Sequence, residues 1–181
     1  MNYLIRKTDE LSGSEIGLIL KLWNIPGWAG MNPSEFRNSF EHSEFHFLLG
    51  ADDQIMALGR INLDFILKIS GKLYGFAEIV GLVSAEKGKG YGRLLVQLLR
   101  ENTEQRCLEA IGFCLRELRP FYRKCSVRIM ENKAKNIMEN NDSEWMPSED
   151  DDILVFYLSE ERKKVLEMLS HEQKAYLINK E

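Results

Sequence analysis

The chain has 181 residues, of which 44% are hydrophobic and 29% are charged, and its formal net charge is −4. This length and composition fit one globular domain that forms its core without a disulfide or a metal. The negative charge argues against a general nucleic-acid binder, because affinity for phosphate needs a surplus of Lys and Arg.

The N-terminal third predicts a strand and two helices. A short strand is expected at residues 2–6, and because no apolar leader is found there we expect a cytoplasmic protein. The segment Ser12-Gly13-Ser14 offers an N-cap to a helix over residues 15–23, and Asn32-Pro33-Ser34 begins a second helix with proline in its first turn. The loop between them carries Trp28, which we expect to be exposed.

Residues 45–83 lack helical periodicity and predict β-structure. The expected strands are 45–50, 54–63, 65–69 and 72–83. The first two are joined by the turn 51–53, and the last two by a tight turn at Ser70 and Gly71.

The segment 86–95, EKGKGYGRLL, places alternating glycines and cations where a strand ends and an amphipathic helix begins. The helix should present Leu94, Leu95, Leu98 and Leu99 on one face. Amides at a helix N-terminus attract phosphate groups. The spacing G-x-G-x-G fits neither the dinucleotide fingerprint nor the P-loop. A flexible turn with incidental cations is the alternative.

The C-terminal half predicts alternating strands and helices. The expected strands are 110–115, 127–130 and 153–158, with a short helix at 119–125. The polar segment 131–152 is expected to be a mobile insertion. Ser159 should cap a last helix that runs towards Leu177. The three cysteines, at 107, 114 and 125, match no zinc spacing, so we expect no metal. No apolar run is long enough to span a membrane, so we expect no membrane partner.

The string KGKGYG, residues 87–92, resembles the (Q/R)-x-x-G-x-(G/A) loop of GNAT-type N-acyltransferases, whose amides bind the pyrophosphate of acetyl-CoA. Residues 110–125 look like the family's fifth strand and following short helix, and residues 153–158 like its last strand. Lys87 stands where the family usually has Gln or Arg. It keeps the positive charge of Arg but lacks the planar guanidinium that donates two parallel hydrogen bonds. The resemblance covers about residues 2–158 and is most specific at 76–127.

This resemblance implies an α/β GNAT fold with a mixed, mostly antiparallel central sheet, splayed strands 4 and 5, and flanking helices. Residues 1–158 would form the acyltransferase domain, and residues 159–181 a C-terminal helix packed on or extending the same domain. The apolar last strand and the C-terminal helix could support a homodimer.

The implied activity is N-acetyl transfer from acetyl-CoA, the co-substrate, to a primary amine of a small molecule or peptide by direct attack. The alternatives are a catalytically silent acyl-CoA-binding regulatory domain and an acyltransferase that uses a longer-chain donor. An N–H near Leu82 could polarise the thioester carbonyl. The implied cofactor-binding residues are Leu82, Val83, Ser84, Lys87, Gly88, Lys89, Gly90, Tyr91, Gly92 and Arg93.

Tyr122 matches the family tyrosine near the sulfur and is the expected acid, since a phenol and an alkyl thiol have similar pKa values, about 10 for the phenol. Simple packing beside Phe121 is the alternative. Glu78 is the expected base because strand alternation gives it apolar neighbours, although a solvated glutamate fits as well. Three residues are held in reserve: Asp64, His42 and His46, the last of which is better explained as a core histidine.

The acceptor amine would lie against the loop that carries Trp28 and Met31, with Trp23 and the segment 131–152 as further walls. The acidic run 148–152 could attract a cationic amine, although a solvated loop explains it as well. Ser126 occupies a position where the family has glycine, which puts the expected left-handed turn in doubt.

Overall fold

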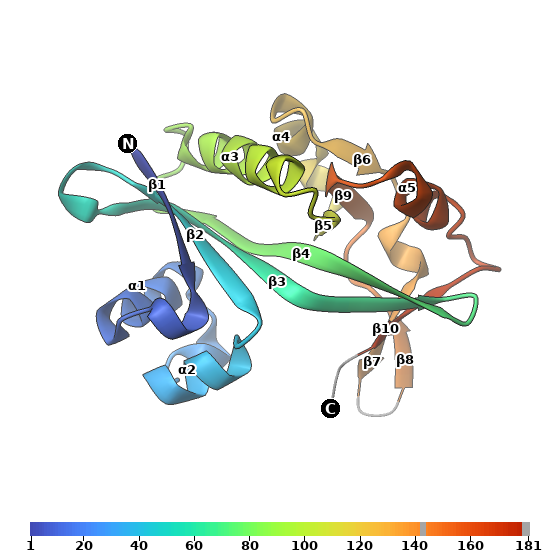
Figure 1. Cartoon of the computed structure of the whole chain (residues 1–181), viewed down its shortest axis with the longest axis horizontal. Coiled ribbons are helices and arrows are strands. Elements are labelled where there is room, and N and C mark those ends of the chain that lie inside the picture. The colour runs from blue at the N-terminus through green and yellow to red at the C-terminus, as the bar shows by residue number, and fades with distance from the viewer. Residues whose placement is uncertain (142–143, 179–181) are drawn as a thin grey trace. The chain divides into compact units, whose positions relative to one another are not determined.

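The computed structural model describes residues 1–141 and 144–178 (Figure 1). The helices are α1 (Gly13–Trp23), α2 (Pro33–Ser39), α3 (Tyr91–Gln105), α4 (Arg119–Lys124) and α5 (Glu160–Glu167). The strands are β1 (Asn2–Lys7), β2 (Ser43–Leu49), β3 (Ile55–Ile69), β4 (Lys72–Ser84), β5 (Ala110–Cys114), β6 (Arg128–Met130), β7 (Ile137–Asn141), β8 (Glu144–Pro147), β9 (Asp152–Tyr157) and β10 (Ala175–Ile178). Of the helices described, none has the length and apolar character needed to cross a membrane.

The chain divides into two compact units, and strands β3 and β4 run through both. Unit 1 comprises Met1–Leu63 and Ile79–Leu98, and unit 2 comprises Asp64–Glu78 and Leu99–Glu181.

In unit 1, β1 pairs with β2 and β2 pairs with β3, both antiparallel. Helix α1 begins at Gly13, two residues before the predicted start, and the first serine of the predicted capping segment, Ser12, is its N-cap. The Ser12 hydroxyl accepts a hydrogen bond from Glu15 N (3.2 Å), and the Glu15 carboxylate accepts one from Ser12 N (2.8 Å). This reciprocal capping satisfies two amide groups of the first turn. The helix ends at Asn24, whose φ of 50° is left-handed.

Aromatic side chains from α1, β2 and the segments around α2 gather within the core of unit 1, among aliphatic residues. The cluster contains Trp23, Trp28, Phe36, Phe40 and Phe45. The Trp28 ring meets those of Trp23 and Phe40 edge-on, at centroid distances of 5.5 Å and 5.4 Å. Trp28 is therefore half-buried, and the expectation of an exposed loop tryptophan is wrong, because the loop folds back onto the helices that flank it.

In unit 2 the strand order is β6-β9-β5-β4-β3-β10-β7-β8. The pairs β5–β9, β6–β9, β7–β8 and β3–β10 are antiparallel, whereas β7–β10 is parallel. The predicted mixed sheet is thus confirmed. Ser70 (φ 48°) and Gly71 (φ 80°) form the predicted turn. The expected break between residues 63 and 65 is wrong, since β3 is one continuous strand.

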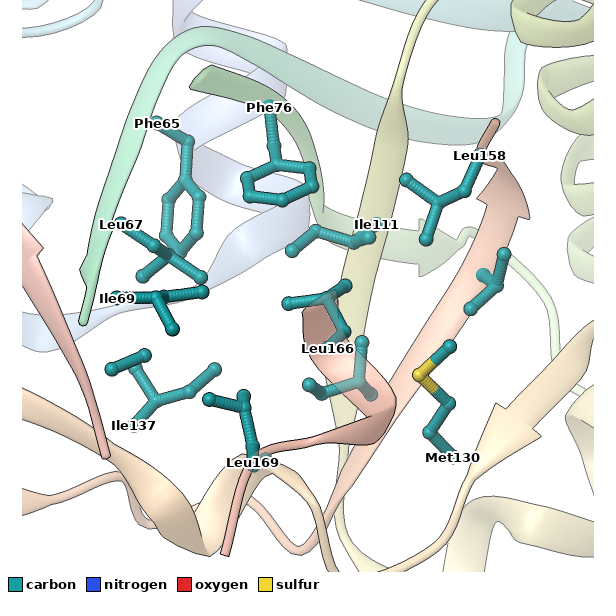
Figure 2. Packing of buried hydrophobic residues seen from close by; sticks show 14 residues of the cluster. Phe65, Leu67, Ile69, Phe76, Ile111, Met130, Ile137, Leu158, Leu166 and Leu169 are labelled. Atoms are coloured by element: carbon teal, nitrogen blue, oxygen red, sulfur yellow. The ribbon is translucent and has the colours of Figure 1, made fainter. Parts of the chain in front are cut away.

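The core of unit 2 is mainly aliphatic, with Phe65 and Phe76 among its members, and joins β3, β4, β5 and α5 (Figure 2). The β3 side chains Phe65, Leu67 and Ile69 alternate inward, and Leu166 and Leu169 close over them. Helix α5 therefore supplies a buried leucine to the sheet.

Two expectations for the C-terminal half are wrong. The segment 131–152 contains β7 and β8, and Ile137 is buried in the aliphatic core, although residues 142–143 lie outside the described part. The last helix ends at Glu167, and Ala175–Ile178 forms β10 between β3 and β7. Residues 176–178 are apolar and could form a helix or a strand. Pairing with β3 and β7 decides for the strand.

Candidate active site

The glycine loop of unit 1 connects β4 to α3. Gly88 and Gly90 have φ values of 77° and 82°, and a Cβ at either position would meet no atom within 4 Å. These glycines are therefore required by backbone conformation and not by crowding. The loop is fixed at its start, where Ala85 N donates to Met56 O at 3.0 Å.

The N-terminus of α3 presents amides and cations to this loop. The first intrahelical bond runs from Leu94 N to Gly90 O (3.0 Å), so the amides of the first turn are left for another acceptor. Lys87, Lys89 and Arg93 are exposed, and no carboxylate in the described residues lies within ion-pair distance of them. The loop therefore presents three cations that form no ion pair within the part of the chain that the structure describes.

Helix α3 buries Leu95, Val96, Leu99 and Thr103. Leu94 is 36% exposed, so its placement on the apolar face is wrong. The inward stripe follows residues 95, 99 and 103, which repeat every four positions, and Leu94 falls outside it.

The end of β4 is held by α1. Trp23 Nε1 donates to Gly81 O at 2.8 Å, and a Cβ on Gly81 would lie 2.9 Å from the Trp23 ring. Val83 turns its side chain into the aromatic cluster, where Trp28 and Met31 also pack. The structure thus brings three predicted site residues into one cluster. Sequence reasoning missed Gly81, although a glycine inside a strand was a signal of close approach.

Tyr122 lies on α4 in unit 2 and is only 7% exposed. Its ring packs edge-on against Phe121, at a centroid distance of 5.0 Å. No residue in the described part of the chain forms a hydrogen bond with its phenol oxygen. Burial, followed by the charges of Cys114, Cys125 and Asp150, raises the pKa of the phenol, which therefore stays protonated at physiological pH.

Glu78 is half-buried on the part of β4 that belongs to unit 2, one residue after Ala77, whose N–H donates to Glu109 O at 2.8 Å. The reserve residue His46 is buried, and its Nδ1 lies 2.5 Å from the Tyr3 hydroxyl, as expected of a core histidine. The other two differ in exposure: Asp64 is half-buried and His42 is exposed.

Several solved structures share this architecture. The catalytic domain of Tetrahymena GCN5 histone acetyltransferase in complex with coenzyme A has a TM-score of 0.54 and 16% identity, over 88% of this chain and 93% of that one. Escherichia coli ElaA has a TM-score of 0.53 and 14% identity, over 86% and 99%. Glucosamine-6-phosphate N-acetyltransferase from Arabidopsis thaliana has a TM-score of 0.51 and 20% identity, over 71% and 92%. No model of a known protein family and no curated protein matches the chain.

The chain has the GNAT fold. The GNAT fold expected from the sequence is therefore confirmed, and the role of the glycine loop stays a prediction. The splay of strands 4 and 5 and the roles of the site residues stay predictions.

Helix α4 is anchored by a network that sequence reasoning missed. Arg119 binds Asp152 through two bonds, one from Nε to Oδ2 and one from Nη2 to Oδ1 (2.6 Å). Its Nη1 also donates to Glu131 (3.0 Å). Asp152 is fully buried, and its Oδ1 also accepts from Asn132 N at 2.8 Å. The network ties the helix of Tyr122 to the start of β9.

The turn after α4 has the left-handed form that the GNAT resemblance implied. Ser126 adopts φ 58° although it is not glycine, and its N–H donates to Arg123 O at 3.0 Å. Residues 1–141 and 144–178 contain no group of three His, Cys, Asp or Glu side chains that could hold a metal.

Proposed function

We propose that the chain transfers an acetyl group from acetyl-CoA to a primary amine of a small molecule or peptide. The observation that carries this proposal is the cationic loop at the N-terminus of α3, with left-handed Gly88 and Gly90. A helix N-terminus with free amides suits a pyrophosphate. The GNAT fold supports the same assignment, since the Tetrahymena relative was solved with coenzyme A.

In this proposal the loop amides with Lys87, Lys89 and Arg93 hold the pyrophosphate, while Leu82 and Ser84 offer backbone groups to the pantetheine arm. The amide near Leu82 polarises the thioester carbonyl. Tyr122 donates a proton to the departing thiolate. Its ring is buried, and its oxygen forms no hydrogen bond within the described part of the chain and is not among the fully enclosed polar atoms, so the hydroxyl is open to a bound ligand.

Trp28 and Met31 form the acceptor wall in this proposal. Both pack on the cluster that also contains Val83, so their position is fixed by α1 and α2. A rigid aromatic wall favours acceptors with an apolar or planar portion next to the amine.

The first test is thermal unfolding with acetyl-CoA, CoA, NAD and ATP. A ligand at about 100 times its Kd adds roughly 2.7 kcal/mol of stability, which raises the midpoint by about 5–10 °C in a chain of this size. We expect acetyl-CoA and CoA to produce this rise, and NAD and ATP to produce none. No rise with either CoA species would contradict the proposal.

Gly92→Glu is the sharpest variant for the loop. Gly92 has a helical φ, so the change adds no left-handed strain, and an acidic residue in the first turn favours the helix dipole. We expect the fold to keep its stability while the rise with CoA disappears. Gly17→Glu is the matched control, since a Cβ at this exposed glycine of α1 meets no atom within 4 Å. Equal rises in both variants would remove the loop assignment.

Turnover is then measured by thiol release with spermidine, glucosamine 6-phosphate and a lysine peptide. Transfer to at least one amine is expected. Binding of CoA without transfer to any amine would favour the silent regulatory domain, and faster reaction with a longer acyl-CoA would favour the longer-chain acyltransferase.

A further inference from the structure

Three consecutive aspartates precede and begin β9, and the fold treats each of them differently. Asp152 is buried and bound by Arg119. The Asp151 carboxylate accepts a hydrogen bond from Arg116 N at 2.8 Å and lies 3.8 Å from Lys135 Nζ. Asp150 is half-buried, and its carboxylate has no hydrogen bond or ion pair with any described residue. The acidic run is therefore not a uniformly solvated loop. The Asp150 carboxylate in it has no hydrogen-bond or ion-pair partner among the described residues.

The backbone fixes Asp150 beside the strand that leads to Tyr122. Asp152 is the register partner of Cys114 at the end of β5, and Asp151 N donates to Cys114 O at 3.1 Å. The negative charge of Asp150 acts on both the Cys114 thiol and the Tyr122 phenol, and it raises the pKa of each. The uncommitted carboxylate and the unpartnered phenol therefore belong to one neighbourhood within unit 2.

We propose that Asp150, and not Glu78, is the base that deprotonates the acceptor amine. This inference rests on the proposed acetyl transfer. The Asp150 carboxylate takes one proton from the substrate ammonium and passes it to solvent. The freed lone pair forms the C–N bond, and collapse of the tetrahedral adduct breaks the C–S bond. Tyr122 gives its proton to the thiolate sulfur and recovers one from the nitrogen of the adduct, directly or through water. The sum is one amide, one thiol and one released proton.

The surroundings of Asp150 suit a base. Burial comes first among the factors that raise the pKa of its carboxyl, followed by the negative charge of Glu139 on β7. Lys135 opposes this shift, while Asp151 and Glu149 add to it. A raised pKa makes the carboxylate a better proton acceptor near neutral pH. Because the protonated form cannot accept a proton, kcat/KM should fall as pH drops through this raised pKa.

Asp150→Asn tests the role in the full chain with acetyl-CoA and the best amine of the panel. We expect kcat/KM to fall by about 10²–10⁴, the usual contribution of a general base, and the acidic limb of the pH–rate profile to disappear. The thermal rise with CoA should be unchanged. Because the carboxylate has no partner to lose, the unfolding midpoint should be the same or higher.

Two matched variants complete the experiment. Asp151→Asn removes a neighbouring carboxylate that already accepts a hydrogen bond from Arg116 N. The pH–rate profile of this variant should keep its acidic limb. Glu78→Gln should keep it as well. An acidic limb retained in Asp150→Asn, or lost in Glu78→Gln alone, would overturn the assignment of Asp150 while leaving acetyl transfer intact. A wild-type chain that binds CoA and transfers acetyl to no amine would overturn the proposed function together with this role.

Discussion

Tyr122 has a buried ring and a hydroxyl that no described residue binds. Its side chain is 7% exposed, yet its hydroxyl has no hydrogen-bond partner in the described part of the chain. The oxygen is not among the fully buried polar atoms that lack a partner, so it reaches solvent while the ring is enclosed. A hydroxyl placed in this way is available to a bound ligand. Packing beside Phe121 is also observed, so the two interpretations of this tyrosine are compatible.

Tyr122→Phe should separate catalysis from stability. We expect kcat to fall by about 100-fold or more, because the proton donor to the thiolate is lost. The rise of the unfolding midpoint with acetyl-CoA should remain, and the free energy of unfolding should stay the same or increase. Steady-state kinetics and urea unfolding measure these quantities.

Tyr3→Phe is the contrasting control. The Tyr3 hydroxyl lies 2.5 Å from His46 Nδ1, so its removal breaks an existing hydrogen bond and should cost about 1 kcal/mol. If Tyr122→Phe weakened acetyl-CoA binding and spared kcat, Tyr122 would be a binding residue and not an acid.

At the scale of an element, α4 is too short to be stable by itself, since it spans only Arg119–Lys124. Its position depends on Arg119, whose side chain is 13% exposed and is bound to the fully buried Asp152. Arg123, on the same helix, also binds Glu131 at 2.6 Å, but both side chains are largely exposed. One helix thus carries a buried and an exposed ion pair.

Arg119→Ala should lower the free energy of unfolding by about 3–5 kcal/mol, because it leaves the Asp152 carboxylate buried without its cation. Arg123→Ala should cost less than about 1 kcal/mol, as is usual for an exposed pair. Urea unfolding of the two variants gives the comparison directly. Similar losses in both would mean that Arg119 does not anchor the helix.

At the scale of the whole molecule, stability should depend on pH on both sides of neutrality. In acid, the pKa of Asp152 is lowered in the folded chain: burial opposes this shift, but the hydrogen bonds from Arg119 and Asn132 outweigh it. Its contribution to stability is present above the unfolded pKa and is lost as pH falls through the lower folded value. In base, burial and then the charges of Asp152 and Asp150 raise the pKa of the Cys114 thiol from 9.0 to about 12.

The alkaline side gives a prediction with a definite sign. Between pH 9 and about 12 the unfolded thiol loses its proton while the folded thiol keeps it, so the free energy of unfolding should fall as pH rises. Tyr122 adds to this fall above pH 10. The measurement is the unfolding midpoint of the wild type and Cys114→Ala from pH 7 to 10.5. The cavity in Cys114→Ala lowers stability by the same amount at each pH. If the thiol causes the alkaline loss of stability, the midpoint of the variant should fall less steeply with pH than that of the wild type. Parallel midpoint curves for the two proteins would contradict this role of the thiol.

The sequence by itself determined the features that depend on neighbouring residues in the chain. The segment 12–14 and Pro33 marked the starts of two helices, Ser70 and Gly71 marked a turn, and the glycine string identified the loop before α3. Each of these rests on local backbone chemistry: a side-chain oxygen that caps amides, a ring that fixes φ, or a residue without Cβ that adopts positive φ.

Only the tertiary structure decided the features that depend on partners distant in the chain. The segment 175–178 became a strand because β3 and β7 flank it, and Trp28 became half-buried because Trp23 and Phe40 receive it. The acidic run looked uniform in sequence, but in the structure Arg119 binds Asp152 and Arg116 N donates to Asp151, while no described residue binds the Asp150 carboxylate. Side-chain partners across strands and helices have no local sequence signal, so they emerge only when the chain is folded.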